Sequence, residues 1–127
     1  MKRNINRKLD YSDVLNFYYP EAVWKIENDS TVYGNIIWIS TDIEQPTKND
    51  LDSKYEELKI KEEIRLLRVE RDRLIAETDW WVLPDRTPTS EQLAYRQALR
   101  DLPDTSSPVL DPTSRIGISG VSWPEKP

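Results

Sequence analysis

The chain has 127 residues, of which 37% are hydrophobic and 32% are charged, with a net charge of −5. This length allows one small domain with extensions, and so few apolar residues predict a thin core that partners or self-association stabilise. The acidic balance argues against nucleic acid as a partner, and a chain without Cys has no disulfides and suits a reducing cytoplasm. We expect no membrane span and no signal peptide, because no apolar run approaches the required length.

The first 46 residues predict a small module with a basic arm, a short helix and a β-hairpin. Residues 1–10 form the arm, which either docks on an acidic surface or stays solvated as a flexible terminus. Ser12 and Asp13 are expected to cap a turn of helix that Pro20 stops. Alternating apolar residues then predict a β-hairpin over Ala22–Ser40. An isolated hairpin is marginal, so the short helix, the long helix or another chain must cover it.

A long helix is expected from Pro46–Thr47 to about Glu77, because no Gly or Pro interrupts this stretch. Thr47 and Asp50 have the spacing of an acidic capping box. At ~1.5 Å per residue the helix is roughly 45 Å long, so we expect part of its apolar stripe to face a partner or a second copy of the chain. The stripe, which shifts phase near its second third, comprises Leu51, Tyr55, Leu58, Ile60, Ile64, Leu67, Leu74 and Ile75.

A bend and a second helix are predicted to complete an αα-hairpin within residues 47–103. Pro84 forbids continuation of the first helix through the bend. Thr89 and Gln92 have the spacing of a second capping box, so we expect the next helix to begin there. It is expected to end at Leu102–Pro103, because proline interrupts helical hydrogen bonding.

The bend contains the adjacent pair Trp80 and Trp81, which cannot both point into one groove. Two interpretations are open: the rings plug the bend, or one ring anchors the helices while the other meets a partner. Aromatic residues and Arg dominate the energetics of protein interfaces, which favours a contact here. The candidate partner-binding residues are Ile64, Leu67, Asp79, Trp80, Trp81, Asp85, Tyr95, Arg96 and Trp123.

Residues 104–127 are too rich in Pro for regular helix and are predicted to form an extended tail. Its alternating apolar residues, Ile116, Ile118, Val121 and Trp123, favour docking as an added strand on another surface. A disordered tail is the alternative, although a solvated segment has little need for these side chains.

Sequence signals for catalysis are nearly absent, since the chain has no His and no Cys and lacks phosphate-binding and Ca²⁺-binding loops. The adjacent pair Glu62–Glu63 points in different directions on a helix and is expected to be solvated. Asp79 and Asp85 are explained as capping and turn residues rather than as an acid/base couple. The sequence therefore predicts no enzyme, cofactor or metal site.

The stretch Arg71–Pro103, about a quarter of the chain, resembles the tail assembly chaperone and tail fibre assembly proteins of tailed bacteriophages. The matching blocks are Arg-Asp-Arg-Leu-Ile-Ala-Glu-Thr-Asp-Trp, Leu-Pro-Asp and Tyr-Arg-Gln-Ala-Leu-Arg-Asp-Leu-Pro. The Trp123–Pro124 step is similar to the family's ending, whereas Arg115–Gly120 differs from it. The segment from Trp38 through Gln45–Lys48 also resembles small proteins of phage tail gene clusters.

The resemblance implies a protein that helps fibres or other tail parts to fold or assemble. Two functions stay open: an assembly factor that binds a tail fibre or baseplate protein and then leaves, and a permanent virion adaptor between fibre and baseplate. The expected partners are therefore proteins, with no nucleic acid, membrane or cofactor. We expect an α+β protein in three parts, residues 1–46, 47–103 and 104–127. It would act in the host cytoplasm during assembly and, as an adaptor, stay in the tail.

Overall fold

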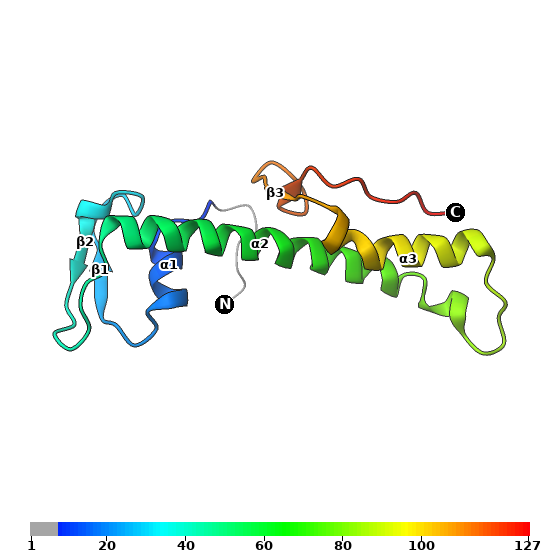
Figure 1. Ribbon diagram of the computed structural model, residues 1–127, viewed down its shortest axis with the longest axis horizontal. Coiled ribbons are helices and arrows are strands. Elements are labelled where there is room, and N and C mark those ends of the chain that lie inside the picture. Colours follow the sequence, from blue (N-terminus) through cyan, green and yellow to red (C-terminus); the bar gives the residue numbers. More distant parts are fainter. Residues whose placement is uncertain (1–7) are drawn as a thin grey trace. The chain divides into compact units, whose positions relative to one another are not determined.

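The computed structural model describes residues 8–127, which divide into two compact units, residues 8–61 and 62–127. The predicted basic arm, as far as residue 7, lies outside the described residues. As predicted, the fold mixes helices with small sheets, since the described chain contains three α-helices and two antiparallel hairpins. The first part of the long helix α2, Lys48–Ala76, belongs to one unit and the second part to the other (Figure 1). Within residues 8–127 no helix combines the length and apolar character that crossing a bilayer requires.

Helix α1, Tyr11–Tyr18, is capped by Asp10. The Asp10 carboxylate accepts hydrogen bonds from the N–H groups of Ser12 and Asp13, at 2.9 Å and 3.3 Å. In return, Asp13 Oδ2 accepts from the Asp10 N–H at 2.9 Å. The predicted capping was wrong for Ser12, because Asp10 is the N-cap residue, whereas Asp13 does take part as the reciprocal member of the box. The helix ends before Pro20, as predicted.

The predicted β-hairpin is present but short. Strands β1, Trp24–Ile26, and β2, Ile36–Trp38, pair antiparallel over their whole length. Just before the second strand, Tyr33–Asn35 forms a 3-10 turn, η1. Between the strands Asn28 has a φ of 68°, a left-handed conformation that Asn adopts more readily than most residues.

Helix α1 packs against the first part of α2. Leu51 and Leu58 of α2 are 0% and 3% exposed. The Tyr11 hydroxyl donates a hydrogen bond to Asp52 Oδ1 at 2.6 Å, which joins α1 to α2. The Tyr11 ring meets the ring of Tyr33 edge-on, with centroids 6.2 Å apart. Trp38 of β2 meets the ring of Tyr19 edge-on with centroids 6.4 Å apart, so part of the cover that a marginal hairpin requires comes from this chain itself.

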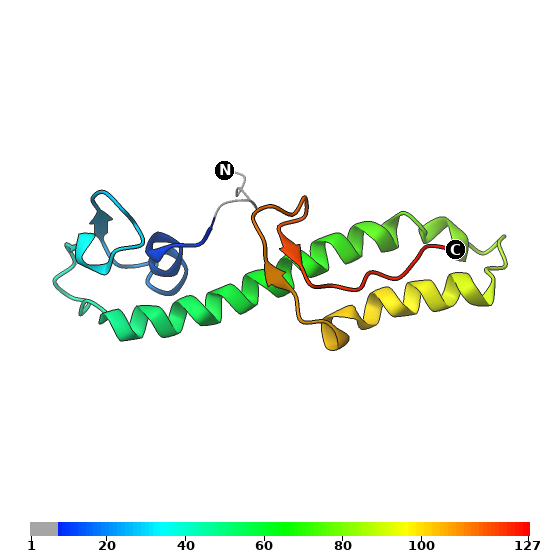
Figure 2. The ribbon, with the colours of Figure 1, turned by 90° about the horizontal axis from the view of Figure 1, so that it is seen from above.

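The second unit is an αα-hairpin with a C-terminal segment laid along it. The second part of α2 is followed by a 3-10 turn, η2, Asp79–Val82, and by helix α3, Ser90–Thr105. Strands β3, Val109–Leu110, and β4, Ile118–Ser119, pair antiparallel. Figure 2 shows the last residues running along α2 and α3. The buried core of this unit consists of Leu66, Leu67, Trp81, Tyr95, Leu99, Leu102 and Ile118.

Both long helices begin at the predicted capping boxes. Thr47 Oγ1 accepts from the Asp50 N–H at 3.1 Å, and Asp50 Oδ2 accepts from the Thr47 N–H at 3.2 Å. At the start of α3, Thr89 Oγ1 accepts from the Gln92 N–H at 3.1 Å, and Gln92 Oε1 accepts from the Thr89 N–H at 2.9 Å. Each box satisfies two backbone donors that the first helical turn leaves free.

Helix α3 continues through Pro103 to Thr105, so the predicted end at Leu102–Pro103 was wrong. Pro103 has no N–H and removes one helical hydrogen bond. Leu102 is nevertheless only 5% exposed, and its carbonyl accepts the Ser106 N–H at 2.9 Å. Burial of Leu102 and the Ser106–Leu102 hydrogen bond offset the bond that Pro103 cannot make, and the helix completes its last turn.

The apolar stripe of α2 was predicted with one wrong member and one omission. Ile60 is 60% exposed, because it follows Leu51 by nine residues and so lies roughly half a turn around the helix from it. Leu66, which the periodicity missed, is 4% exposed, and Leu67 is fully buried. In each unit this chain's own segments cover most of the stripe, and self-association along α2 stays a prediction.

Candidate protein-binding site

The bend between α2 and α3 is a tight, hydrogen-bonded turn. Thr78 is fully buried, and both its N–H and its hydroxyl donate to the carbonyl of Ile75, each at 2.9 Å. The Trp81 N–H then donates to the carbonyl of Thr78 at 3.0 Å and starts η2. These bonds satisfy backbone groups at the end of α2 and fix the direction in which the next residues leave it.

Arg96 ties α3 to this bend. Its side chain is buried, and Nη1 donates to Thr78 Oγ1 at 2.7 Å and to the Ile75 carbonyl at 3.2 Å. Asp79 Oδ1 lies 3.3 Å from both Nη1 and Nη2 and supplies the opposing charge. These contacts match the charge and the Nη donors of the buried guanidinium, whereas its Nε is buried without a hydrogen-bond partner. Arg96 is thus a structural clamp within the hairpin.

The two Trp residues divide the roles that the sequence left open. Trp81 is 4% exposed and packs on Tyr95, with ring centroids 6.0 Å apart. Trp80 is 48% exposed, meets Trp81 edge-on with centroids 6.1 Å apart, and carries the Arg86 guanidinium 4.6 Å from its ring centroid. One ring therefore anchors the helices, and the adjacent ring is presented to solvent.

Trp80 belongs to an exposed apolar group at the end of the helical hairpin, here called the tip surface. Its four members come from η2, the loop after it and the first turn of α3, and each is between 44% and 49% exposed. Asp79 and Asp85 add negative charge beside them. Four large apolar side chains that are close in sequence and remain half exposed are typical of an interaction surface. The members are Trp80, Val82, Leu83 and Leu93.

The structure separates the remaining predicted contact residues into core and surface. Leu67 and Tyr95 are buried in the core of the second unit, and Ile64 is half-buried. Trp123, in the C-terminal segment, is half-buried against the same core. Asp85 is exposed in the loop between η2 and α3. Of the predicted set, Trp80, Asp79 and Asp85 are therefore open to a partner, whereas the buried members support the hairpin.

Carboxylates of α2 face the C-terminal segment, and sequence reasoning missed this. Glu62 and Glu63, expected to be solvated, are 6% and 9% exposed. Arg65 donates to both carboxylate oxygens of Glu62, at 2.7 Å and 3.1 Å, and Glu63 Oε2 accepts the Leu110 N–H at 3.2 Å. The expectation was wrong for Glu63 because a later strand uses it as an acceptor, and wrong for Glu62 because this residue is buried in a pair with Arg65 of the same helix. A partner 47 residues away gives no local sequence signal.

Glu70 is the centre of a second charged group on α2. The Arg73 guanidinium donates to its two oxygens at 2.6 Å and 3.0 Å, and Arg115 lies 3.6 Å from one of them. Hydrogen bonding from Arg73 holds the pKa of Glu70 below its ordinary value, against a smaller opposing effect of burial. The same pairing raises the pKa of Arg73. Glu70 therefore stays ionised beside the C-terminal segment.

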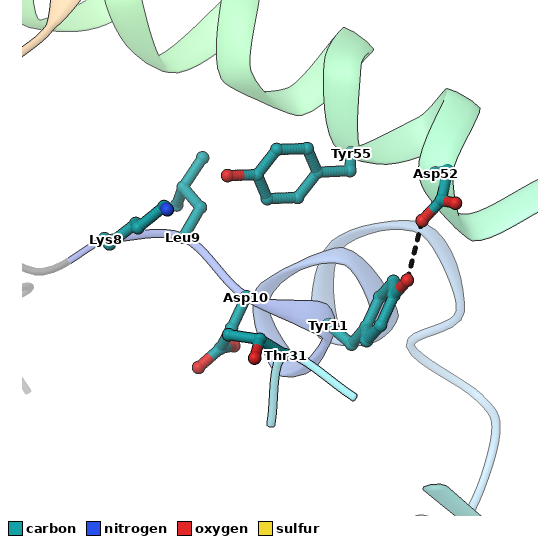
Figure 3. A pocket seen from close by; sticks show the side chains of 7 residues that line it. All are labelled: Lys8, Leu9, Asp10, Tyr11, Thr31, Asp52 and Tyr55. Carbon is teal, nitrogen blue, oxygen red and sulfur yellow. Dashed lines mark hydrogen bonds between the residues drawn. The ribbon is translucent and has the colours of Figure 1, made fainter. Parts of the chain in front are cut away.

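The first unit contains a separate cavity of about 200 Å³ (Figure 3). Its wall includes Tyr11, whose hydroxyl points to Asp52, with Tyr55 on the neighbouring turn of α2. Burial and the Asp52 hydrogen bond raise the pKa of Tyr11 to about 12, so the phenol is neutral at ordinary pH. Over residues 8–127 we find no group of His, Cys, Asp and Glu arranged to hold a metal ion.

Comparison with known families links the second unit to a described role. A family model described as "Phage tail assembly chaperone protein" matches residues 64–127. The match covers the second part of α2, the bend, α3 and the C-terminal segment. A search of curated proteins and a search of solved structures found no match.

Proposed function

Because the chain belongs to the phage tail assembly chaperone family, we propose that it binds a tail fibre or other tail protein through its helical hairpin. In this role it acts in the host cytoplasm and holds its client until the client joins the growing tail. The family establishes a role in tail assembly, and the geometry of the hairpin supports the choice of binding surface.

The tip surface is the observation that carries the proposal. Trp80 is half exposed, yet its backbone is fixed by the turn that Thr78 starts and its ring rests on buried Trp81. A large aromatic ring held on a rigid base loses little conformational entropy when it binds. Interfaces concentrate their energy in such anchors, with Trp and Arg enriched among them. Arg86, stacked on Trp80, adds a second side chain of this kind.

The charge around the tip surface indicates the chemistry of the client. Asp85 and Glu91 lie near the apolar members in sequence with Arg86 as the one basic residue between them, while the charge of Asp79 is balanced by Arg96. A complementary client surface would therefore place basic residues around an apolar pocket that accepts Trp80. This arrangement raises the association rate and excludes acidic surfaces.

The test is co-production of the tagged chain with each tail fibre and baseplate protein of the same virus, followed by co-purification. We expect one of these proteins to be retained by the wild-type chain and to be lost when Trp80 and Leu83 are both replaced by Ser. Val69→Ser is the matched control, because Val69 is a similarly exposed apolar residue on α2. Equal retention by all three chains would show that the tip surface is not the binding site.

A permanent place in the virion is the alternative, and the composition of purified particles distinguishes it. We expect mass spectrometry of mature particles to find the chain absent or far below the copy number of the fibre protein. Stoichiometric presence would identify an adaptor instead of a chaperone that leaves.

A further inference from the structure

The C-terminal residues 121–127 lie on α2 and α3 between two surface hollows. One hollow, of about 350 Å³, is lined on the α2 side by Glu70 and Glu77 and on the segment side by Trp123. The other, of about 500 Å³, is lined by Ala94 and Ala98 of α3 and by the last four residues. Tyr95 lines both hollows, and Figure 2 shows the backbone of the segment running along α2 and α3.

This segment is held much less firmly than the strands that precede it. Ile118 in β4 is 2% exposed and belongs to the core, whereas Val121 and Trp123 are only half-buried against it. Residues 120–127 form no helix or strand. Lys126 contributes an ion pair with Glu77 at 3.8 Å and lies 5.9 Å from the ring centroid of Trp81, contacts that are weak at a solvated surface.

Gly120 marks the boundary between the anchored and the weakly held parts. Its φ is 79°, in the left-handed region, and an added Cβ would lie 3.4 Å from the carbonyl oxygen of Ser107. Glycine is suited to this conformation, in which an L side chain is strained. Residues 121–127 follow this turn, whereas Ile118 before it belongs to the core.

We propose that residues 121–127 occupy, in the free chain, a groove that binds an extended segment of the client tail protein, and that the client displaces them. This inference rests on the proposed function and adds a second contact to the tip surface. Here the groove means the surface between α2 and α3 lined by Glu70, Leu74, Glu77, Glu91, Ala94, Tyr95 and Ala98.

The segment itself shows what chemistry the groove accepts. Val121 and Trp123 are two residues apart, so in an extended chain they project to the same side, and Pro124 favours the extended form. Lys126 adds only its ion pair with Glu77, because Arg73 and Arg115 already balance the charges of Glu70 and Glu77 in this hollow. We therefore expect a client segment with two apolar residues at this spacing and a Pro after them.

The first experiment uses a labelled peptide with the sequence of residues 118–127 as the probe. In the wild-type chain its own segment competes at high effective concentration, so replacing Val121 and Trp123 by Ser in the full chain should tighten peptide binding by about tenfold or more. Val69→Ser, which removes exposed apolar surface elsewhere, should leave peptide binding unchanged. Thermal melts confirm that each variant is folded. A folded double variant that does not bind the peptide would overturn the inference.

The second experiment locks the segment in place. Because the chain has no Cys, Ala94→Cys and Glu125→Cys place two unique thiols around the same hollow, where a short thiol crosslinker can join them. The crosslinked chain should retain about tenfold less of the co-produced fibre protein than either single-Cys chain treated with the same reagent. Undiminished retention by the crosslinked chain would overturn the inference and leave the proposed function intact.

Two other results of these experiments would each rule out the proposed groove. If the untreated wild-type chain retains no tail protein, the proposed function fails, and the inference fails with it. If the wild-type chain forms a dimer that dissociates on replacement of Val121 and Trp123, the occupant of the groove is a second copy of the chain. That result would also overturn the inference, because the segment would then serve self-association.

Discussion

Separate replacement of the two adjacent Trp residues by Ala should have opposite consequences. Trp81 is 4% exposed against Tyr95, and truncating a buried Trp costs about 3–5 kcal/mol. For a unit of this size, 1 kcal/mol lowers Tm by roughly 4–8 °C, so Trp81→Ala should lower Tm by roughly 12 °C or more. Trp80 is half exposed, and its loss removes mainly the contact with Arg86, worth about 0.5–1 kcal/mol.

Client affinity should show the reverse order. An aromatic anchor at an interface contributes about 2 kcal/mol or more, so Trp80→Ala should weaken client binding by roughly thirtyfold. Thermal melts by circular dichroism, and titration of the co-purified client at a temperature where both variants are folded, measure the two effects. The reasoning is refuted if both variants lose only stability, because the bend would then be core and the binding surface would lie elsewhere.

Three further substitutions test contacts that the structure defines. Glu70→Gln should make Tm depend less on pH in the acid range. The pKa of Glu70 is lowered in the folded state, so its contribution to stability is present above the unfolded pKa and is lost as pH falls through the folded pKa. A variant whose Tm falls as steeply in acid as that of the wild type would contradict this. Tyr11→Phe should cost about 1 kcal/mol at neutral pH and remove one phenol that titrates near pH 12 in an absorbance titration, whereas an unchanged titration would argue against the bond to Asp52. Thr89→Ala should lower the unfolding free energy by about 1 kcal/mol in denaturant melts. An unchanged unfolding free energy would show that the capping box does not stabilise the helix.

Sequence reasoning was most successful where local chemistry decides the structure. The capping boxes at Thr47 and Thr89 were predicted because their side-chain acceptors lie three residues from their donors. The adjacency of Trp80 and Trp81 predicted that the rings diverge, but it left open whether both are buried, and the structure shows which ring is exposed. The error at Asp10 has the same origin, because several acceptors near the start of α1 compete for the same N–H groups.

The missed features depend on partners distant in sequence. Glu63 is buried because it accepts a hydrogen bond from Leu110, and Arg96 is buried because the bend surrounds it with Thr78 and Asp79. Neither residue type is usually buried, so composition alone predicts both at the surface. The fold class and the helical hairpin were therefore within reach of the sequence, whereas the docking of the C-terminal segment required the structure.

Assembly of virions without this chain is the most direct test of the central claim. Electron microscopy can count complete tails among particles made by virus with the gene deleted, with complementation by the wild-type chain or by the chain with Trp80 and Leu83 replaced by Ser. We predict that deletion leaves particles with incomplete or missing tail parts, that the wild-type chain restores them and that the substituted chain does not. Complete tails in the absence of the chain would contradict its role as a tail assembly chaperone.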